Sequence, residues 1–283
     1  MTIYEKLRPP IAVALAVSMV AGTGGTCPAE PVDRPVGSFS AITASHALYA
    51  EDDFDGPSTS PPDPGMWNIE TGGVGWGADE AQAYTADPAN IRQDGAGHLV
   101  IEARNDDGHI TSARLNTQGK VEVTEGLVAA RIKMPAGQGL HPAFWLLGQS
   151  LADVGWPACG EIDVVELLNS GSTAYFTVIG PRVAGQRGSA SHSQLQLTSQ
   201  MGGLADGFHT YWLYKQSGQL VFGIDENAFA TVTPADLPPG QQWIYDSPYF
   251  ALLNLAVGGV WPGPLGQGVL PKQMVVDWVR FYR

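Results

Sequence analysis

The sequence predicts an all-β protein in which short antiparallel strands pack as a sandwich or a barrel. Short apolar runs recur along the chain with turn residues between them. The 35 glycines and 21 prolines among 283 residues indicate many turns. No helical period is sustained over the length that a domain helix needs. Because β-sandwiches of about 200–250 residues are routinely single domains, we expect one domain to account for most of the chain.

Residues 1–26 have the pattern of an export signal. Lys6 and Arg8 precede an apolar run at 11–21, which is too short to span a bilayer and has the size of a signal-peptide core. An uncleaved anchor or a buried helix is the alternative. Cys27 follows directly, as at a lipoprotein cleavage site, although the usual aliphatic residue before such a cysteine is absent. We expect a secreted or cell-envelope protein, with lipidation of Cys27 left open and no stable membrane insertion after signal removal.

The next segment, residues 27–47, is rich in Pro, Ser, Ala and Gly and is predicted to be a linker, which places the folded domain at 48–283. Within the domain, Val128, Ala130 and Ile132 alternate with less apolar residues, a pattern typical of a strand with one buried face. The predicted strands lie at residues 99–103, 127–134, 175–179, 209–215, 220–225, 249–255 and 274–282.

Charge and cysteine content exclude several classes of protein. The formal net charge of −13 argues against nucleic acid or an anionic membrane surface as a partner, because both require clustered Lys and Arg. A neutral polysaccharide is compatible with it. The two cysteines, Cys27 and Cys159, do not make a disulfide-rich scaffold, and Cys159 is expected to be a small buried residue. The scattered histidines form no metal-ligand motif, so we expect no required cofactor.

Three carboxylates stand close together in an apolar, β-branched stretch: Glu161, Asp163 and Glu166. Side chains alternate along a strand, so Glu161 and Asp163 share a face while Glu166 would point the other way. One extra residue, a β-bulge, would return Glu166 to that face. Retaining glycoside hydrolysis needs such a set, because one carboxylate attacks the sugar and a second protonates the leaving oxygen. The alternative is a solvent-facing acidic strand.

A longer series of motifs surrounds the carboxylates. It contains Trp156-Pro157-Ala158-Cys159-Gly160-Glu161-Ile162-Asp163-Val164-Val165-Glu166 and, in order along the chain, residues 53–56, 76–85, 111–115, 139–148, 253–259 and 276–282. This series resembles glycoside hydrolase family 16, in the bulged form of its β-1,3-glucanases, the laminarinases. The resemblance covers residues from about 48 to 283.

The resemblance implies a β-jelly roll whose concave sheet carries the substrate cleft. It also implies an endo-acting hydrolase of a β-linked polysaccharide, with β-1,3-glucan as the preferred candidate substrate. Glu161 would be the nucleophile, and Glu166 the general acid and then the general base. Asp163 would hydrogen-bond Glu161. Negative charge from Glu161 and Asp163 would favour the proton that Glu166 must carry at the start. Retention of anomeric configuration and a monomer are expected.

Further site residues follow from the same resemblance. Asn90 and Arg114 match positions that contact the sugar, and both can donate hydrogen bonds. Trp145 and Trp261 are the preferred sugar platforms, with core packing as the alternative for any tryptophan. Asp277 matches a position that binds a structural calcium in some relatives; a plain strand-end Asp is the alternative.

Some positions depart from the family pattern. His141 stands where Trp is usual, Ile179 where laminarinases commonly have His, and Tyr214-Lys215 where Glu-Trp is usual. These changes keep other functions open: a hydrolase of another β-linked polysaccharide, a transglycosylase, a carbohydrate-binding protein with little or no catalysis, or a structural cell-wall lipoprotein. Both glutamates are present, which favours catalysis.

Overall fold

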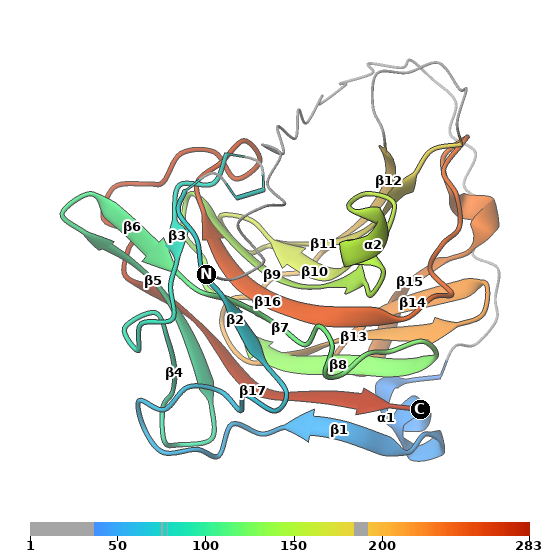
Figure 1. The fold of residues 1–283 in the computed structure, drawn as a ribbon, viewed down its shortest axis with the longest axis horizontal. Helices are drawn as coiled ribbons and strands as arrows, with labels where there is room; N and C mark the ends of the chain where they lie inside the picture. The colour runs from blue at the N-terminus through green and yellow to red at the C-terminus, as the bar shows by residue number, and fades with distance from the viewer. Residues whose placement is uncertain (1–36, 75, 78, 184–191) are drawn as a thin grey trace.

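The computed structural model describes residues 37–183, apart from 75 and 78, and residues 192–283. Two β-sheets pack face to face and enclose the main hydrophobic core between them, which confirms the all-β prediction (Figure 1). Neighbouring strands are antiparallel except for one short parallel pair. The expected signal segment and Cys27 lie outside the described residues. No helix in the described part of the chain has the length and hydrophobicity needed to cross a membrane.

The larger sheet has ten strands. Its main order is β15 (Asn227–Val232), β14 (Gln219–Ile224), β13 (His209–Gln216), β8 (Gly126–Lys133), β17 (Lys272–Tyr282), β5 (Leu99–Asp106), β6 (His109–Ser112) and β3 (Ala83–Tyr84). In addition, β1 (Leu48–Asp52) pairs with β17, and β4 (Ile91–Gln93) pairs with β5. Val128, Ala130 and Ile132 of β8 face the main core, as their alternation predicts.

The smaller sheet has seven strands and carries the three carboxylates. Its order is β12 (His192–Gln200), β11 (Thr173–Pro181), β10 (Glu161–Leu167), β9 (Leu140–Gly148), β16 (Tyr249–Val257), β7 (Arg114–Asn116) and β2 (Asn68–Glu70). All nine residues of β16 are buried, since one face packs on the core and the other lies at the centre of the site. The apolar, β-branched and aromatic residues of these strands suit a pleated surface that is covered on both sides.

The predicted linker at 27–47 is partly wrong. Residues 39–45 form helix α1 (Phe39–Ser45), whose first turn is capped by the Ser38 side chain. Its residue Ile42 is buried against Trp212, and Phe39 stacks on Trp278 on the outer side of the larger sheet. The apolar pattern of one short helix was hidden in a Ser- and Ala-rich stretch, so the folded unit begins before residue 48.

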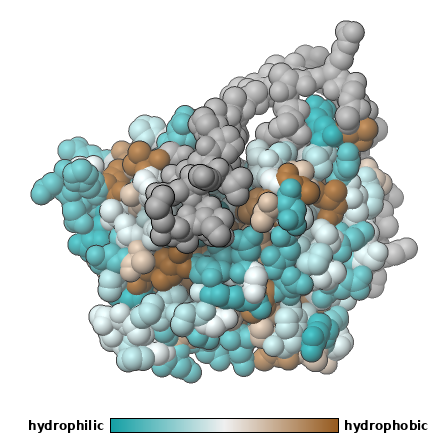
Figure 2. Space-filling model, viewed as in Figure 1, coloured by the Kyte–Doolittle hydropathy of each residue, from teal (hydrophilic) through white to brown (hydrophobic). Residues whose placement is uncertain are grey.

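Two other short helical segments are α2 (Leu151–Val154) and the 3-10 turn η2 (Pro234–Asp236). Leu151 packs against a small apolar cluster that contains Leu147, Cys159 and Phe250 at one end of the smaller sheet. This packing holds the loop after α2 over the end of β10. Figure 2, in the same view as Figure 1, shows a largely hydrophilic surface with separate hydrophobic patches.

Candidate active site

The three carboxylates share one face of the smaller sheet because β10 contains the predicted bulge. Asp163 lies opposite Trp145 of β9, while Glu166, three residues later, lies opposite Ala143, only two residues earlier in β9. The same shift appears against β11. Val164 and Val165 are therefore both buried in the core, and Glu166 returns to the face of Glu161 and Asp163. We call this face of the seven-stranded sheet the site face.

Cross-strand neighbours extend the site face over five further strands. Glu166 stands in a row whose members, in strand order, are Tyr175, Glu166, Ala143, Asn254, Arg114 and Glu70. Asp163 stands in the next row with Thr177, Trp145, Leu252, Asn116 and Asn68. Because directly opposite residues in antiparallel strands point to the same side, strand register alone brings Arg114 and Trp145 to the carboxylates.

Glu161 is the acid whose environment is most clearly defined. The indole Nε1 of Trp156 donates a hydrogen bond of 2.8 Å to its Oε2. Burial and the charge of Glu166 raise the pKa of Glu161 to about 7, against the lowering effects of Trp156 and Arg114. The carboxyl therefore ionises near neutral pH.

Asp163 is more deeply enclosed and 4% exposed. Burial, with the charges of Glu166 and Glu161, raises its pKa well above the ordinary value. The expected hydrogen bond between Asp163 and Glu161 is not formed in this structure, although both residues are described. The raised pKa of Asp163 favours its protonated form.

Glu166 is held by a histidine. Nε2 of His141, on β9, lies 2.7 Å from Oε1 of Glu166, and both side chains are largely buried. Ala143, directly opposite Glu166, is small and leaves room for His141 to reach it diagonally across the strands. The sequence predicted the negative neighbours Glu161 and Asp163 but not the histidine.

Arg114 and Trp145 form one wall of the site. The guanidinium lies 4.7 Å from the ring centre of Trp145 and 5.1 Å from that of Trp76, and it donates to the Glu70 carboxylate. The indole Nε1 of Trp145 donates to Oδ1 of Asn254 at 2.7 Å. Both predicted residues therefore lie on the site face with fixed orientations.

Trp261 contacts His141 and Tyr175. Its ring meets the His141 ring edge-on at 5.2 Å between centroids and the Tyr175 ring at 4.9 Å. The loop after β16 thus places an aromatic surface beside Glu166. Trp261 joins the predicted carboxylates, Arg114 and Trp145 in a single site.

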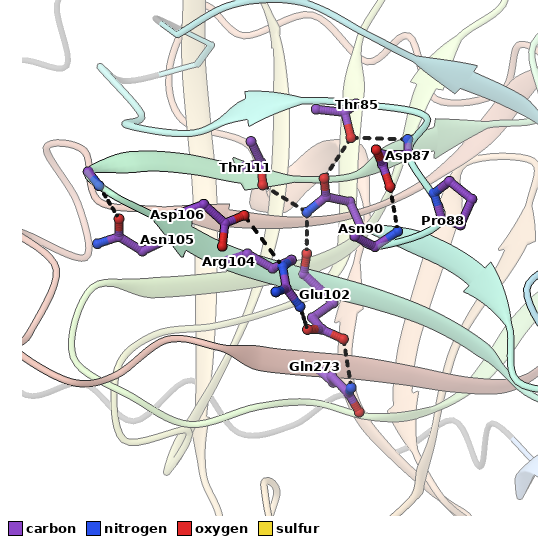
Figure 3. Close-up of polar contacts among 12 residues, drawn as sticks. Thr85, Asp87, Pro88, Asn90, Glu102, Arg104, Asn105, Asp106, Thr111 and Gln273 are labelled. Carbon is purple, nitrogen blue, oxygen red and sulfur yellow. Dashed lines mark hydrogen bonds and ion pairs between the residues drawn. The ribbon is translucent and has the colours of Figure 1, made fainter.

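Asn90 lies outside the group of residues on the site face. It is 2% exposed, and its amide nitrogen donates to the Glu102 carbonyl and the Thr111 hydroxyl, while Thr85 donates to its oxygen (Figure 3). Around it, Glu102 accepts from Arg92, Arg104 and Gln273. Both amide hydrogens of Asn90 are engaged, so the structure assigns it to a buried network that joins β4, β5 and β6 in place of the predicted sugar contact.

Asp277, the predicted calcium ligand, lies on β17 in the larger sheet. Its carboxylate accepts a hydrogen bond from Arg131 in an ion pair. Within the described ranges, no group of three or more His, Cys, Asp or Glu side chains is arranged to hold a metal ion. A calcium at Asp277 stays a prediction, and the guanidinium already neutralises the charge that would attract it.

The contacts of several site residues were not predicted from the sequence. Trp156 stood within the motif but carried no assigned role, and His141 was noted only as a departure from the family pattern. Asn254 alternates with core residues along β16 and is 5% exposed. Its polar side chain in an apolar run was a signal that it faces a site, since a buried amide needs partners.

Comparisons with known proteins agree with this geometry. The model of the glycosyl hydrolases family 16 matches residues 78–280. A β-glucanase of Rhodothermus marinus is 32% identical over 265 residues, which cover 88% of this chain and 89% of that protein. A keratan-sulfate endo-1,4-β-galactosidase of Sphingobacterium multivorum is 30% identical, covering 90% of this chain and 59% of that protein.

The fold agrees as well. The structure of the laminarinase catalytic domain from Thermotoga maritima superimposes with a TM-score of 0.73 and 33% identity, covering 84% of this chain and 98% of that domain. The chain belongs to the glycosyl hydrolases of family 16.

Proposed function

We propose that this glycosidase is a secreted, endo-acting hydrolase of β-1,3-glucan that retains the configuration of the anomeric carbon. The observation that carries the proposal is the bulge in β10, which places Glu161, Asp163 and Glu166 on one face. Two carboxylates on the same side of a bound sugar suit a double displacement, in which Glu161 attacks and Glu166 transfers the proton. Export is supported by the pattern of residues 1–26. The proposed mechanism requires no cofactor, and we propose a monomer.

The substrate class is supported by relatives whose names describe glucanases and by the aromatic and hydrogen-bonding walls of the site. Trp145 and Trp261 would stack on sugar rings, and Arg114 would donate to hydroxyl groups. A second candidate is a β-galactoside polymer. It is favoured by the similarity to a keratan-sulfate endo-1,4-β-galactosidase and by His141 and Ile179, which alter the site at two positions.

The first test is reducing-sugar release by the purified protein on β-1,3-glucan, mixed-linkage β-1,3-1,4-glucan, β-galactan, agarose and xylan. We expect release from β-1,3-glucan and a loss of at least about 10³-fold in Glu161→Gln, because the nucleophile is removed. NMR of the first product should show the β-anomer. Release from galactan alone would favour the second candidate. Binding without release from any polymer would indicate a carbohydrate-binding protein.

The role of Glu166 has its own test. Glu166→Ala should lose activity on polysaccharide but keep much more of it on an aryl glycoside whose leaving group needs no protonation. The comparison is made with Glu161→Gln, which should be equally inactive on both substrates. If Glu166→Ala showed no preference for the activated leaving group, Glu166 would not be the general acid.

A further inference from the structure

His141 forms a hydrogen bond to the carboxylate that the proposed mechanism uses as acid and base. The 2.7 Å contact joins Nε2 of His141 to Oε1 of Glu166, and the exposed fractions of the two side chains are 16% and 12%. A pair so enclosed is shielded from the water and salt that weaken surface ion pairs. The contact is also unusual for the position, where the resemblance leads one to expect a Trp.

The surroundings of His141 fix the ring in place. Trp261 contacts it edge-on, and Glu166 holds its Nε2 through the hydrogen bond. Burial alone would lower the pKa of His141, but the hydrogen bond and charge of Glu166, with the charges of Glu80 and Glu161, outweigh burial and raise it. The protonated imidazole is therefore favoured, in direct contact with the proposed acid.

We propose that His141 is a positioning residue that shares the catalytic proton with Glu166, so that the hydrogen-bonded pair supplies the proton to the leaving oxygen. This inference rests on the proposed function. When the proton lies on His141, Glu166 is ionised; when it moves along the hydrogen bond, Glu166 becomes the acid. The total charge of the pair is the same in both forms.

The proton balance of the two half-reactions is complete. In the first, Glu161 forms a bond to the anomeric carbon, the glycosidic bond breaks, and the proton passes from the pair to the leaving oxygen. In the second, water attacks the anomeric carbon, the bond to Glu161 breaks, and Glu166 takes a proton from the water. The pair is then reloaded, with the proton again shared between Glu166 and His141.

Other ionisable groups face this pair from each neighbouring element. They are Glu161 and Asp163 on β10, Glu80 before β3 and Tyr175 on β11, while Arg114 on β7 acts on Glu161. The neighbouring β16 presents Ala256 opposite His141 and Asn254 opposite Ala143, neither of which titrates. A protonated His141 therefore offsets a concentration of carboxylates, and its charge also favours ionisation of Glu161.

The kinetic test compares pH profiles of kcat/KM for the wild type and His141→Gln, which keeps a hydrogen-bond donor but does not titrate. In the variant we expect the acid limb of the profile to move to higher pH, because Glu161 loses a positive neighbour. The alkaline limb should move to lower pH, because Glu166 alone then holds the proton. Each shift should be about one pH unit. The control Trp261→Phe changes the packing of His141 but not its hydrogen bond, and should alter KM without moving either limb.

An NMR titration tests the pair without any substrate. The ring-proton signal of His141 is assigned as the one lost in His141→Gln, and its pKa is measured in the wild type and in Glu166→Gln. We expect the pKa to fall by about one unit or more in Glu166→Gln. An unchanged pKa, or pH limbs that stay in place in His141→Gln, would overturn the inference. Absence of hydrolysis by the wild type would overturn the proposed function, while the NMR result would still decide the pairing.

Discussion

Glu161 combines two demands that oppose each other in a folded protein. The nucleophile proposed here must be ionised, yet burial and the nearby charge of Glu166 raise the pKa of Glu161 to about 7 from the usual 4.5. Between these two values the folded protein holds a proton that the unfolded chain has lost. The free energy of unfolding therefore falls as pH rises from about 4.5 to about 7. Stability is lost at the position of the proposed nucleophile.

This leads to a prediction for Glu161→Gln. The amide carries no charge, so the variant should be more stable than the wild type above pH 7, by about 1–3 kcal/mol. The difference should disappear near pH 4, where the wild-type carboxyl is protonated. Chemical denaturation at pH 4 and pH 8 measures it, with Glu122→Gln, an exposed site, as control. Equal stability differences at both pH values would contradict the prediction.

At the scale of elements, the bulge in β10 decides which face Glu166 occupies. Val164 is the residue without a partner opposite it in β9, since Asp163, Val165 and Glu166 pair with consecutive residues of β9. Removing Val164 would leave all three pairings unchanged. Removing Val165 as well would shorten the strand by a second residue and turn Glu166 toward the core.

The corresponding prediction concerns two deletions. Deletion of Val164 should preserve folding and a measurable part of the activity, with some loss of stability from the lost core side chain. Deletion of both Val164 and Val165 should abolish activity and lower the unfolding temperature much further, because a carboxyl would enter the core. Circular dichroism and polymer hydrolysis compare the two. Equal loss of activity in both variants would show that the bulge itself is needed.

Helix α1 belongs to the folded unit through its apolar side. Ile42 is buried against Trp212, and Ser40 donates to Glu226 at 2.7 Å from its hydroxyl. We predict that Ile42→Ala lowers the free energy of unfolding by about 2 kcal/mol and leaves kcat unchanged, since α1 lies on the larger sheet, away from the site face. Ala44→Ser, at an exposed position of the same helix, is the control. A changed kcat would contradict this separation.

At the scale of the whole molecule, Lys215 links the two sheets. It lies on β13 of the larger sheet and is 1% exposed, and its ammonium group donates to the carbonyls of Tyr245 and Ser247, which precede β16 of the smaller sheet. The Nζ atom also lies 4.7 Å from the ring centre of Tyr249. Burial lowers the pKa of Lys215 to about 8 from 10.5, against the charges of Asp246 and Glu125.

This lowered pKa predicts a pH-dependent stability. Between about pH 8 and 10.5 the unfolded chain binds the proton that the folded protein has released, so the contribution of Lys215 to stability rises with pH. Relative to Lys215→Met, the wild type should gain about 3 kcal/mol over this range. The control Lys272→Met, at an exposed position, should show no such difference. A wild-type advantage that is constant with pH would contradict a buried, titrating lysine.

The sequence by itself determined much of this protein. Strand alternation predicted that Glu161 and Asp163 share a face, because the side-chain period of a strand is a local property. The bulge that brings Glu166 to that face was predicted from the bulged form of the family motif. The ordered motifs predicted the family and the all-β fold. Arg114 and Trp145, chosen through their places in those motifs, lie on the site face, and their contact with sugar stays a prediction.

Only the tertiary structure decided which side chains touch the carboxylates. His141 reaches Glu166 across 25 positions of sequence, and Trp156 reaches Glu161 because α2 packs over the end of β10. The structure also moved Asn90 into a separate network and residues 39–45 into a packed helix. These outcomes depend on strand register and on loop packing between distant segments. Local periodicity does not encode such contacts, because each is selected by the free energy of the whole fold.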